Sequence, residues 1–339
     1  MKHFFCIAFV LVSFIGCLQD NQSNPQPMTD DEATEVPRFI ELVGHTGYEH
    51  HSIMYDEVYG IVFSPDGKKV ATSSQDSTAR VWDAETGKEL RKFDASSLFV
   101  SFSPDGKKIS VSTGIFDVES GKELQRLVHI AAISSDWKKY VSFDKDRLGH
   151  IYDLESGKEL HTFGEQKYSL DCLPIFSPDS KIIVVCGYDG TNHPTHIKDT
   201  RTPMRDIRIF DVESGKELHR IEGFTGIIRH VAFSPDGKKI AIGGPFSSVR
   251  IFDVTLGKEL HYSGGFNNNG VSSVVFSPDG KKIVTVSSSV QLWDAESGKE
   301  LQNLSEIIPT RTKSVSFSPD GKKVGVAGAY AEAGILVLQ

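Results

Sequence analysis

The stretch FSPDGKK, residues 63–69, decides the fold of this chain because it recurs along the sequence. Its other copies begin at Phe102, Ile133 (as ISSDWKK), Phe176 (as FSPDSK), Phe233, Phe276 and Phe317. A second phrase, of the form DxESGKEL, follows most copies, starting at Asp83, Asp117, Asp153, Asp211, Asp253 and Asp294. Self-similarity at a period of about 42 residues is typical of repeat architectures, in which each repeat is one supersecondary unit.

The first repeat contains four short runs of β-branched and aromatic residues. These runs are VYGIVF (58–63), KKVATSS (68–74), ARVWD (79–83) and ELRKF (89–93). The segments between them carry Pro, Asp, Ser and Gly, as tight turns do, so each repeat is predicted to be four antiparallel strands. A single four-stranded sheet cannot bury both of its faces. The repeats must therefore stack, and we predict an all-β chain closed into a seven-bladed β-propeller.

The phrase at the end of the third predicted strand carries a resemblance to a known family. It reads VWD at 81–83, LWD at 292–294, and IFD or IYD in the copies that begin at Ile115, Ile151, Ile209 and Ile251. Paired with FSPDG, it resembles the WD-repeat β-propellers over roughly residues 38–339. The Gly-His pair usual between the family's repeats is clear only at Gly44 and His45, and most repeats lack it.

The resemblance also implies a structural role for four residues of the first repeat. His45, Ser74, Asp76 and Trp82 match the family's hydrogen-bonded tetrad, with Ser73 as an alternative to Ser74. The family's way of closing the ring is implied as well. The last repeat supplies only three strands before Gln339, whereas Arg38 to His45 aligns with the fourth strand of another repeat, Glu217 to Phe224. We therefore predict that the N-terminal strand completes the last blade and removes an exposed sheet edge.

The chain before Arg38 follows a different pattern. Lys2 and His3 precede an apolar run, residues 4–16, that is too short to span a bilayer but has the length of a secretory h-region. The run ends in FIGC, which resembles a bacterial lipobox whose cysteine becomes the lipidated first residue. We predict a signal peptide over 1–17 with lipid attachment at Cys17, and a plain signal-peptidase site is the alternative.

The location of the protein follows from this prediction. Residues 18–37 are polar, acidic and contain three prolines, as a flexible tether does, and the propeller occupies 38–339. We expect an exported, membrane-anchored lipoprotein of the cell envelope, on the periplasmic or outer-membrane face. Because residue 18 is not aspartate, sorting rules of Gram-negative bacteria favour the outer membrane. Without lipidation, the protein would be secreted.

The charge of the chain limits its partners. The formal net charge is −8, so nucleic acid is not expected as a partner, and a membrane is expected only through the lipid anchor. The Lys-Lys pairs of the repeated turns could form a basic ring, but glutamates in neighbouring turns dilute it, which favours ordinary solvated turns. We expect a monomer that holds no cofactor.

Two cysteines, Cys172 and Cys186, lie within the repeats. If residues 178–180 form a three-residue hairpin loop, Ser177 faces Lys181 and the two cysteines lie directly opposite each other on adjacent strands. An exported protein permits a disulfide between them. Two buried free thiols are the alternative.

The turns of an up-and-down sheet alternate between its ends, which assigns the loops to two faces. The FSPDG and ESGKE turns share the repeated-turn face. The turns between second and third strands share the opposite, variable face with the connections between blades. That variable face carries the long segments 44–57 and 187–206, and long loops on a rigid scaffold commonly bind partners. We select as candidate partner-binding residues Tyr48, His50, His51, Tyr55, Tyr188, His193 and His196.

No recognised catalytic or metal motif is present in the sequence. The histidines His50, His51, His193 and His196 are only weak metal candidates, because their spacing matches no known ligand set, and solvent-exposed loop histidines are the expectation. We therefore predict a non-enzymatic scaffold that binds a protein or peptide through the variable face. The alternative is a propeller enzyme, or a small-molecule or metal binder, that uses the central channel as lactonase-like and quinone-cofactor propellers do.

Overall fold

The computed structural model describes residues 38–46, 48–50, 53–55, 57–95, 99–127, 130–165, 168–189, 205–244, 248–264, 270–308, 311–330 and 332–338. They belong to one compact unit, Pro37–Gln339, which is distinct from Met1–Val36. Cys17 and the predicted signal peptide and tether lie outside the described residues. Within the described part of the chain every regular element is a strand, and no helix long and apolar enough to cross a membrane occurs there.

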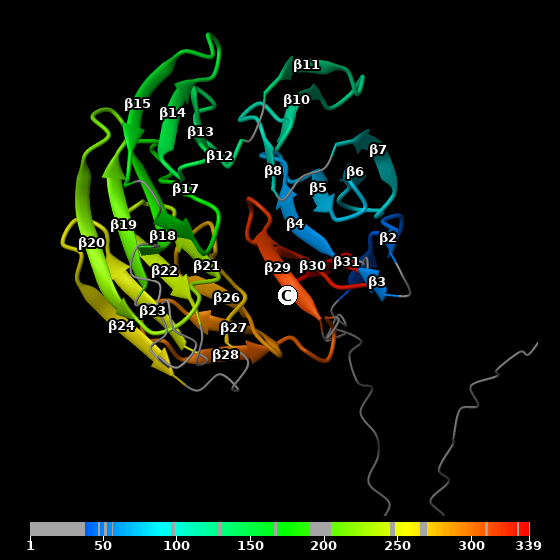
Figure 1. Cartoon of the computed structure of the whole chain (residues 1–339). Coiled ribbons are helices and arrows are strands. Elements are labelled where there is room, and N and C mark those ends of the chain that lie inside the picture. The colour runs from blue at the N-terminus through cyan, green and yellow to red at the C-terminus, as the bar shows by residue number, and fades with distance from the viewer. Residues whose placement is uncertain are drawn as a thin grey trace, which may run out of the picture. The chain divides into compact units, whose positions relative to one another are not determined.

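The first four blades are antiparallel sheets whose strands follow one another in sequence order, and they lie in succession around a ring in Figure 1. Blades 1 and 2 consist of β4 (Val58–Phe63), β5 (Lys69–Ser74), β6 (Thr78–Asp83), β7 (Glu89–Asp94), β8 (Val100–Phe102), β9 (Lys108–Val111), β10 (Gly114–Asp117) and β11 (Glu123–Arg126). Blades 3 and 4 consist of β12 (Ala132–Ile133), β13 (Lys139–Phe143), β14 (Gly149–Asp153), β15 (Glu159–Phe163), β16 (Tyr168–Leu170), β17 (Ile175–Phe176), β18 (Ile182–Asp189), β19 (Arg205–Asp211) and β20 (Glu217–Phe224).

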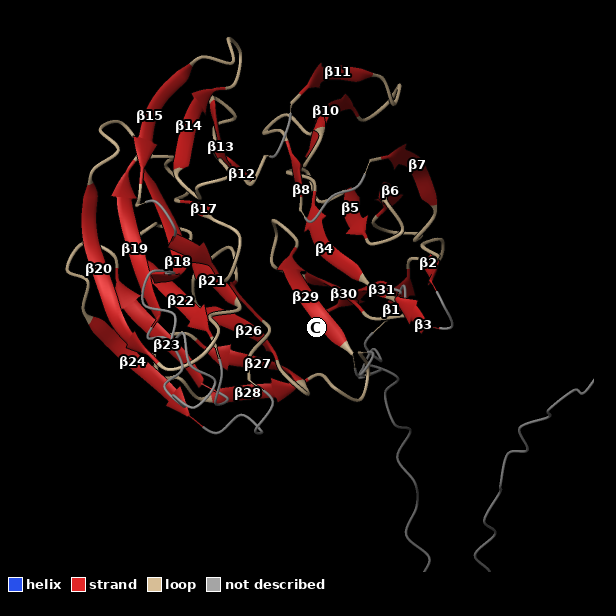
Figure 2. Ribbon diagram, in the orientation of Figure 1, coloured by secondary structure: helices blue, strands red, loops and turns tan. Residues whose placement is uncertain are grey.

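The remaining blades complete the ring, as the strand view in Figure 2 shows. Blades 5 and 6 consist of β21 (His230–Phe233), β22 (Lys239–Gly243), β23 (Ser248–Asp253), β24 (Glu259–Gly264), β25 (Ser273–Phe276), β26 (Lys282–Val286), β27 (Val290–Asp294) and β28 (Glu300–Asn303). Blade 7 consists of β29 (Thr312–Phe317), β30 (Lys323–Gly328), β31 (Ala333–Val337) and β1 (Phe39–Glu41). The fold is therefore the predicted seven-bladed β-propeller.

The ring closes through the N-terminal strand, which confirms the prediction. Strand β1 pairs antiparallel with β31, with Phe39 opposite Leu336 and Ile40 opposite Ile335. Ile40 and Leu42 are 6% and 1% exposed and belong to the apolar cluster that joins the last blade to the first. Burial of two such aliphatic side chains favours the closed ring by about 1.5–3 kcal/mol each.

The repeated turn has the same hydrogen bonds in every blade. In blade 1, the Ser64 hydroxyl donates to Asp66 Oδ1 at 2.6 Å, and Ser64 Oγ accepts the amide of Lys69 at 2.9 Å. The six equivalent Ser–Asp pairs span 2.6–2.7 Å. Gly67 has a φ of +69°, and a Cβ atom built on it would lie 3.5 Å from the Cδ atom of Pro319 in the last blade. The turns therefore also contact one another around the ring.

Apolar clusters fill the spaces between neighbouring blades, and they differ in size. The cluster between blades 4 and 5 contains twelve buried residues, whereas the one between blades 2 and 3 contains five: Ile115, Leu127, Ile130, Tyr140 and Leu154. A groove of about 530 Å³ opens at this second interface beside Leu124 and Trp137. Among the described residues, the apolar cluster between blades 2 and 3 is therefore the smallest.

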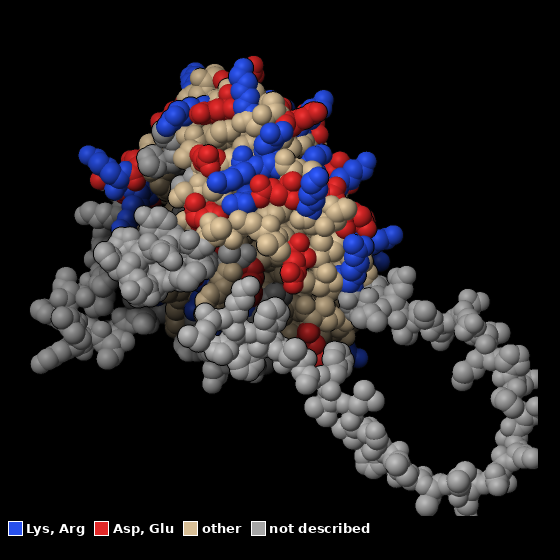
Figure 3. Space-filling view, turned by 90° about the vertical axis from the view of Figure 1, so that its right-hand side faces the viewer, with Lys and Arg blue, Asp and Glu red and all other residues tan. Residues whose placement is uncertain are grey.

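The charged residues of the turns are intermixed. Lys323 lies 2.7 Å from Glu85 and Lys139 lies 2.9 Å from Glu213, each pair joining neighbouring blades. On the side shown in Figure 3, basic and acidic side chains lie next to one another over the described surface. The arrangement on that side favours solvated turn residues over a functional basic ring.

Candidate functional site

The structure describes the candidate partner-binding residues only in part. A two-stranded sheet, β2 (Tyr48–His50) and β3 (Ile53–Tyr55), forms within the first long segment and pairs Tyr48 with Tyr55. The sequence analysis did not predict this hairpin. Tyr188 lies near the end of β18, and its ring is 5.1 Å from the guanidinium carbon of Arg205. His51, His193 and His196 lie outside the described residues.

The first blade contains a buried polar network at its variable face. His45 Nδ1 lies 2.8 Å from Asp76 Oδ2, and its Nε2 lies 2.7 Å from the Thr72 hydroxyl. Because a carboxylate only accepts, Nδ1 carries a proton and donates it to Asp76. Trp82 Nε1 donates to the same Thr72 oxygen at 2.8 Å. The predicted His45, Asp76 and Trp82 thus come together, but the hydroxyl between them belongs to Thr72.

The assignment of Ser74 or Ser73 to this network was wrong. Ser74 instead donates to the carbonyl oxygen of Glu57 at 3.0 Å, and Ser73 Oγ makes no hydrogen bond. Side chains alternate between the faces of a strand, so Thr72 and Ser74 point to the same face of β5 and both were compatible with the pattern. Position along the strand decides between them, since Thr72 lies nearer to the indole of Trp82.

The network holds a carboxylate in its charged form. Burial by itself raises the pKa of Asp76, but hydrogen bonds from His45 and Thr78 outweigh that effect and lower the pKa well below its usual value. Arg80 adds an ion pair with Glu89 of the neighbouring strand. This part of the first blade therefore anchors the connection that follows β1.

Cys172 and Cys186 form a disulfide bond with their Cα atoms 6.1 Å apart. The register predicted for them was wrong, however. Ser177 pairs with Ile182 through a longer turn, and Phe176 lies opposite Ile183. Cys172 lies between β16 and β17, where the inner strand of blade 4 is interrupted, and this irregularity brings it to Cys186.

The interruption of the inner strand is held by a buried ion pair that the sequence analysis missed. Asp171 Oδ2 accepts a hydrogen bond from Arg205 Nε at 2.7 Å and another from the amide of Ile228 at 3.1 Å. The side chains of Arg205 and Asp171 are 10% and 5% exposed. The contact therefore links the inner strand of blade 4, the end of the second long segment and the start of blade 5.

A second group of charges continues this network between strands β16 and β19 of blade 4. Tyr168 donates to the carboxylate of Asp206, and burial followed by this contact raises the pKa of its hydroxyl. Arg208, with a side chain 1% exposed, lies 4.3 Å from the centre of the Tyr168 ring and 3.4 Å from both Asp206 and Glu165. The residues where the second long segment ends, Arg205 and Asp206, are thus fixed from both sides.

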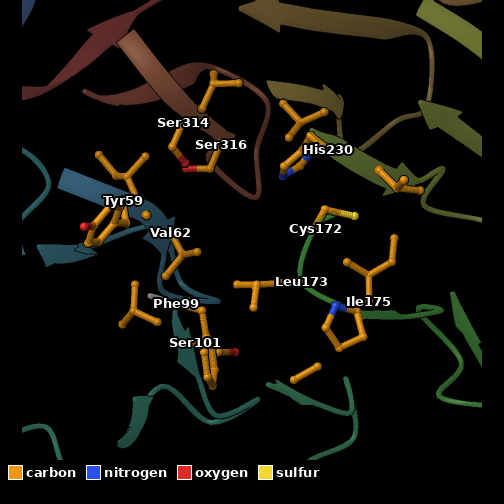
Figure 4. Close-up of a pocket in the computed structure, with 18 of the residues that line it drawn as sticks. Tyr59, Val62, Phe99, Ser101, Cys172, Leu173, Ile175, His230, Ser314 and Ser316 are labelled. Atoms are coloured by element: carbon orange, nitrogen blue, oxygen red, sulfur yellow. The ribbon is translucent and has the colours of Figure 1, made fainter. Parts of the chain in front are cut away.

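The inner strands of the blades surround an axial cavity of about 560 Å³. Figure 4 shows Val62, Phe99 and Leu173 facing the open space, and His230, Ser101, Ser314 and Ser316 also line the cavity. Burial lowers the pKa of His230, whose Nδ1 accepts the amide of Val274 at 3.5 Å. The lining includes no Asp or Glu among the described residues. In the described part of the chain, no three His, Cys, Asp or Glu side chains are grouped to hold a metal.

Together, the blades and their closure define a seven-bladed β-propeller, a class that serves many functions. Four segments, residues 42–83, 157–192, 215–253 and 258–294, match the family model for "WD domain, G-beta repeat". The chain therefore contains WD40 repeats, as the resemblance in the sequence implied.

Several curated proteins are similar to this chain at moderate identity. Eukaryotic translation initiation factor 3 subunit I of Taeniopygia guttata is 25% identical over 269 residues, which cover 59% of this chain and 78% of that protein. The same subunit of Anopheles gambiae is 33% identical over 141 residues, covering 39% and 42%. Apoptotic protease-activating factor 1 of Rattus norvegicus is 30% identical over 208 residues, 55% of this chain but only 15% of that protein.

Proposed function

We propose that this propeller is a non-enzymatic scaffold that binds a protein or peptide partner through its variable face. One observation carries the proposal: the polar networks that depart from the repeat lie where the two long variable-face segments join the blades. His45 and Asp76 fix the start of the first segment, and Asp171 with Arg205 fixes the end of the second. A rigid base reduces the entropy lost when a loop binds.

The comparisons support a binding role. One relative is named as a subunit of an initiation factor and another as a protease-activating factor, and both names describe proteins that act on or with other proteins. Fold alone does not determine function, so the support from the described contacts matters more. The names of these relatives do not identify the partner of this chain.

Export and lipid attachment at Cys17 form part of the same proposal. The apolar segment that ends in Gly16 and Cys17 supports it, and so does the disulfide between Cys172 and Cys186, which is of a kind that persists in oxidising compartments. In a bacterial host, Cys17→Ser is expected to move the protein from the membrane to the soluble fraction. Cys6→Ser is the matched control and should leave it in the membrane. A mature N-terminus elsewhere, or no acyl mass on Cys17, would contradict the anchor.

Affinity capture with two pairs of variants tests the binding face. Tyr48→Ala with Tyr188→Ala alters the variable face, and Lys107→Ala with Lys238→Ala alters the repeated-turn face. We expect the tyrosine pair to lose the partner and the lysine pair to retain it, with thermal unfolding confirming that both remain folded. Loss with the lysine pair and retention with the tyrosine pair would assign binding to the opposite face.

A shortened loop provides a second test of the same assignment. Replacing residues 190–204 by a short Gly-Ser linker leaves Tyr188, Arg205 and Asp206 in place, so the network at the base of the segment is kept. Capture should fail although the melting temperature stays within a few degrees of wild type. Undiminished capture would exclude this segment as the binding element.

A further inference from the structure

We propose that the groove between blades 2 and 3 is a binding site for a neutral saccharide, with the indole of Trp137 as its central contact. The groove has a volume of about 530 Å³, within the range of about 300–1,000 Å³ that is common for ligand pockets. Residues of the FSPDG and ESGKE turns line it, so it belongs to the repeated-turn face. The proposal therefore does not rest on partner binding through the variable face.

Trp137 departs from the repeat at a position where the backbone is left-handed. Its φ is +56°, whereas glycine occupies this position in five of the other repeated turns and Ser180 occupies it in blade 4. A bulky side chain at positive φ is unfavourable, and such outliers are commonly retained at functional sites. The indole is therefore present although it makes the turn less favourable than glycine would.

The equivalent glycines show where a side chain at this position points. A Cβ atom built on any of them would lie 3.5–3.6 Å from the Cδ atom of the turn proline in the preceding blade, as Gly106 does from Pro65. By the same geometry the side chain of Trp137 extends from blade 3 toward Pro104 of blade 2, and both residues line the groove. The indole thus forms part of the wall at the interface of the two blades.

The indole also offers a hydrogen-bond donor. The other two tryptophans, Trp82 and Trp293, donate from Nε1 to threonine hydroxyls at 2.8 and 2.9 Å. Among the described contacts Trp137 Nε1 makes no such bond, and it is not one of the buried atoms that lack a partner. This N–H group is therefore accessible to a ligand. Next to it the groove has an apolar side chain, Leu124, that is 47% exposed.

The charged side chains of the groove have both signs and do not pair across the interface. Between blades 3 and 4 the corresponding lysine and glutamate, Lys139 and Glu213, form an ion pair at 2.9 Å. Lys108 and Glu155 line the groove between blades 2 and 3 together with Asp105, and no ion pair joins Lys108 to Glu155 among the described residues. An anion would be repelled by the two carboxylates and a cation by the lysine. The groove therefore favours a neutral ligand that can both donate and accept hydrogen bonds.

A sugar ring combines the properties that this lining requires. One face of the ring carries C–H groups that pack against an aromatic side chain, while the hydroxyl groups at its rim both donate and accept. The indole and Leu124 match the apolar face. Lys108 donates to hydroxyl groups and Glu155 accepts from them, and hydrogen bonds to such charged partners are stronger than neutral ones. A neutral saccharide is thus the class of ligand that fits the groove.

Isothermal titration calorimetry of the full chain with three neutral trisaccharides, namely cellotriose, maltotriose and triacetylchitotriose, tests the proposal. Wild type should bind at least one of them. Trigalacturonic acid, in which every sugar carries a carboxylate, should bind at least tenfold more weakly. Trp137→Gly restores the glycine of the other turns and should weaken binding of the neutral trisaccharide at least tenfold. The proposal is overturned if wild type binds none of the three, if trigalacturonic acid binds as tightly, or if Trp137→Gly binds undiminished.

The neighbouring interface provides a matched control. The groove between blades 1 and 2, of about 520 Å³, has a lysine, a leucine and a glutamate in the same positions but Gly106 in place of Trp137. Glu155→Gln should weaken trisaccharide binding at least threefold, and Glu119→Gln, at the equivalent position, should leave it unchanged. Both glutamates are exposed, so this comparison remains decisive if Trp137→Gly fails to fold. Equal binding by the two variants, or weakening by Glu119→Gln alone, would refute the site.

Discussion

Blades 1 and 4 hold their variable-face connections by different chemistry. Blade 1 centres on one histidine, one carboxylate and one shared hydroxyl, in which Thr72 serves both His45 and Trp82, and a single arginine, Arg80, lies 3.7 Å from the carboxylate of Asp76. Blade 4 uses arginines and carboxylates, with Arg208 buried against Tyr168 and Arg205 paired with Asp171. The first network is compact and hydrogen-bonded, while the second joins three separate segments of the chain through charge.

The difference has an energetic meaning. A buried hydrogen bond contributes about 1 kcal/mol, whereas removal of one partner from a buried ion pair leaves an uncompensated charge and costs about 3–5 kcal/mol. The loss of Arg208 in blade 4 should therefore cost more stability than the loss of the Thr72 hydroxyl in blade 1. Blade 4 also carries the longest departures from the repeat, so its network keeps an irregular region in one conformation.

The largest expected effect concerns the turns that both blades share. Hydrogen bonds from the serine hydroxyls lower the pKa values of Asp66 in blade 1 and Asp179 in blade 4, and five other turn aspartates are shifted in the same direction. A lowered folded-state pKa contributes stability above the unfolded value of about 3.9. That stability is lost as the pH falls through the folded values. Urea unfolding at pH 7, 5 and 3 should show similar stability at the first two and a steep fall at the third.

Arg208→Met tests the charged network of blade 4 directly. The variant removes the buried cation next to Asp206 and Glu165, which keep only their contacts with Arg220 and Tyr168, and should cost about 3 kcal/mol in the free energy of unfolding. Arg250→Met is the matched control, since Arg250 occupies the same strand position in blade 5 but has a side chain 24% exposed and pairs at 2.8 Å with Glu259. The control should cost about 1 kcal/mol or less. Equal losses by denaturant titration would refute the special role of blade 4.

The disulfide of blade 4 is expected to have a slightly smaller effect. The two cysteines are separated by 14 residues, and a loop of this size contributes about 3 kcal/mol in the chain-entropy model, less any native-state strain. The double variant Cys172→Ser, Cys186→Ser should lower stability by up to this amount relative to the oxidised protein. Under reducing conditions the difference should disappear, and its persistence there would mean that the cysteines act through packing.

Thr72→Val measures the corresponding loss in blade 1. The substitution keeps the shape but leaves His45 and Trp82 without their common partner, which should cost about 2 kcal/mol. Ser74→Ala, in the same strand and on the same face, should cost about 1 kcal/mol or less, because only its bonds to the neighbouring backbone are lost. A larger loss for Ser74→Ala would restore the original assignment of the tetrad.

The smallest expected effect concerns the second repeated turn, of the form DxESGKEL, in blades 5 and 6. In blades 1 and 6 the turn aspartate accepts a hydroxyl, from Thr86 at 2.7 Å and from Ser297 at 2.6 Å, whereas blade 5 has Leu256 there, 60% exposed. Leu256→Ser should stabilise the domain by about 0.5–1 kcal/mol. The reverse change, Ser297→Leu, should destabilise it by a similar amount, and two changes of the same sign would contradict this account of the turn.

The repeat made most of the fold predictable. Seven copies of one turn, with β-branched runs between them, indicated the blades, and the alignment of Arg38–His45 with a fourth strand indicated the closure. The two errors, in the tetrad hydroxyl and in the strand pairing at Ser177, arose where a shift of one or two residues along a strand changes which side chains meet. Thr72 and Ser74 lie on the same face of one strand, and the turn after Phe176 is one residue longer than expected, so the residue facing Ser177 was misplaced.

The polar network of blade 4 could not be derived from the repeat. Arg208 occupies the position of Arg80 and Arg250, and nothing in the pattern shows that it becomes buried. Its partners come from segments that alignment of the repeats treats as irregular. The axial cavity has the same origin, since its lining depends on where the irregular segment before Ile175 lies. Lipid attachment at Cys17 and the roles of His51, His193 and His196 stay predictions.

Closure of the ring by β1 also fixes an order of events during synthesis. The strand Phe39–Glu41 leaves the ribosome before any blade, yet its partner Ala333–Val337 is made only after the first six blades. A contact between such distant segments forms slowly, because a long loop must close before the pairing contributes. The nascent domain is therefore an open arc with an unpaired edge at each end. Until β31 is made and pairs with β1, chaperone binding and proteolysis should concentrate on blades 1 and 7.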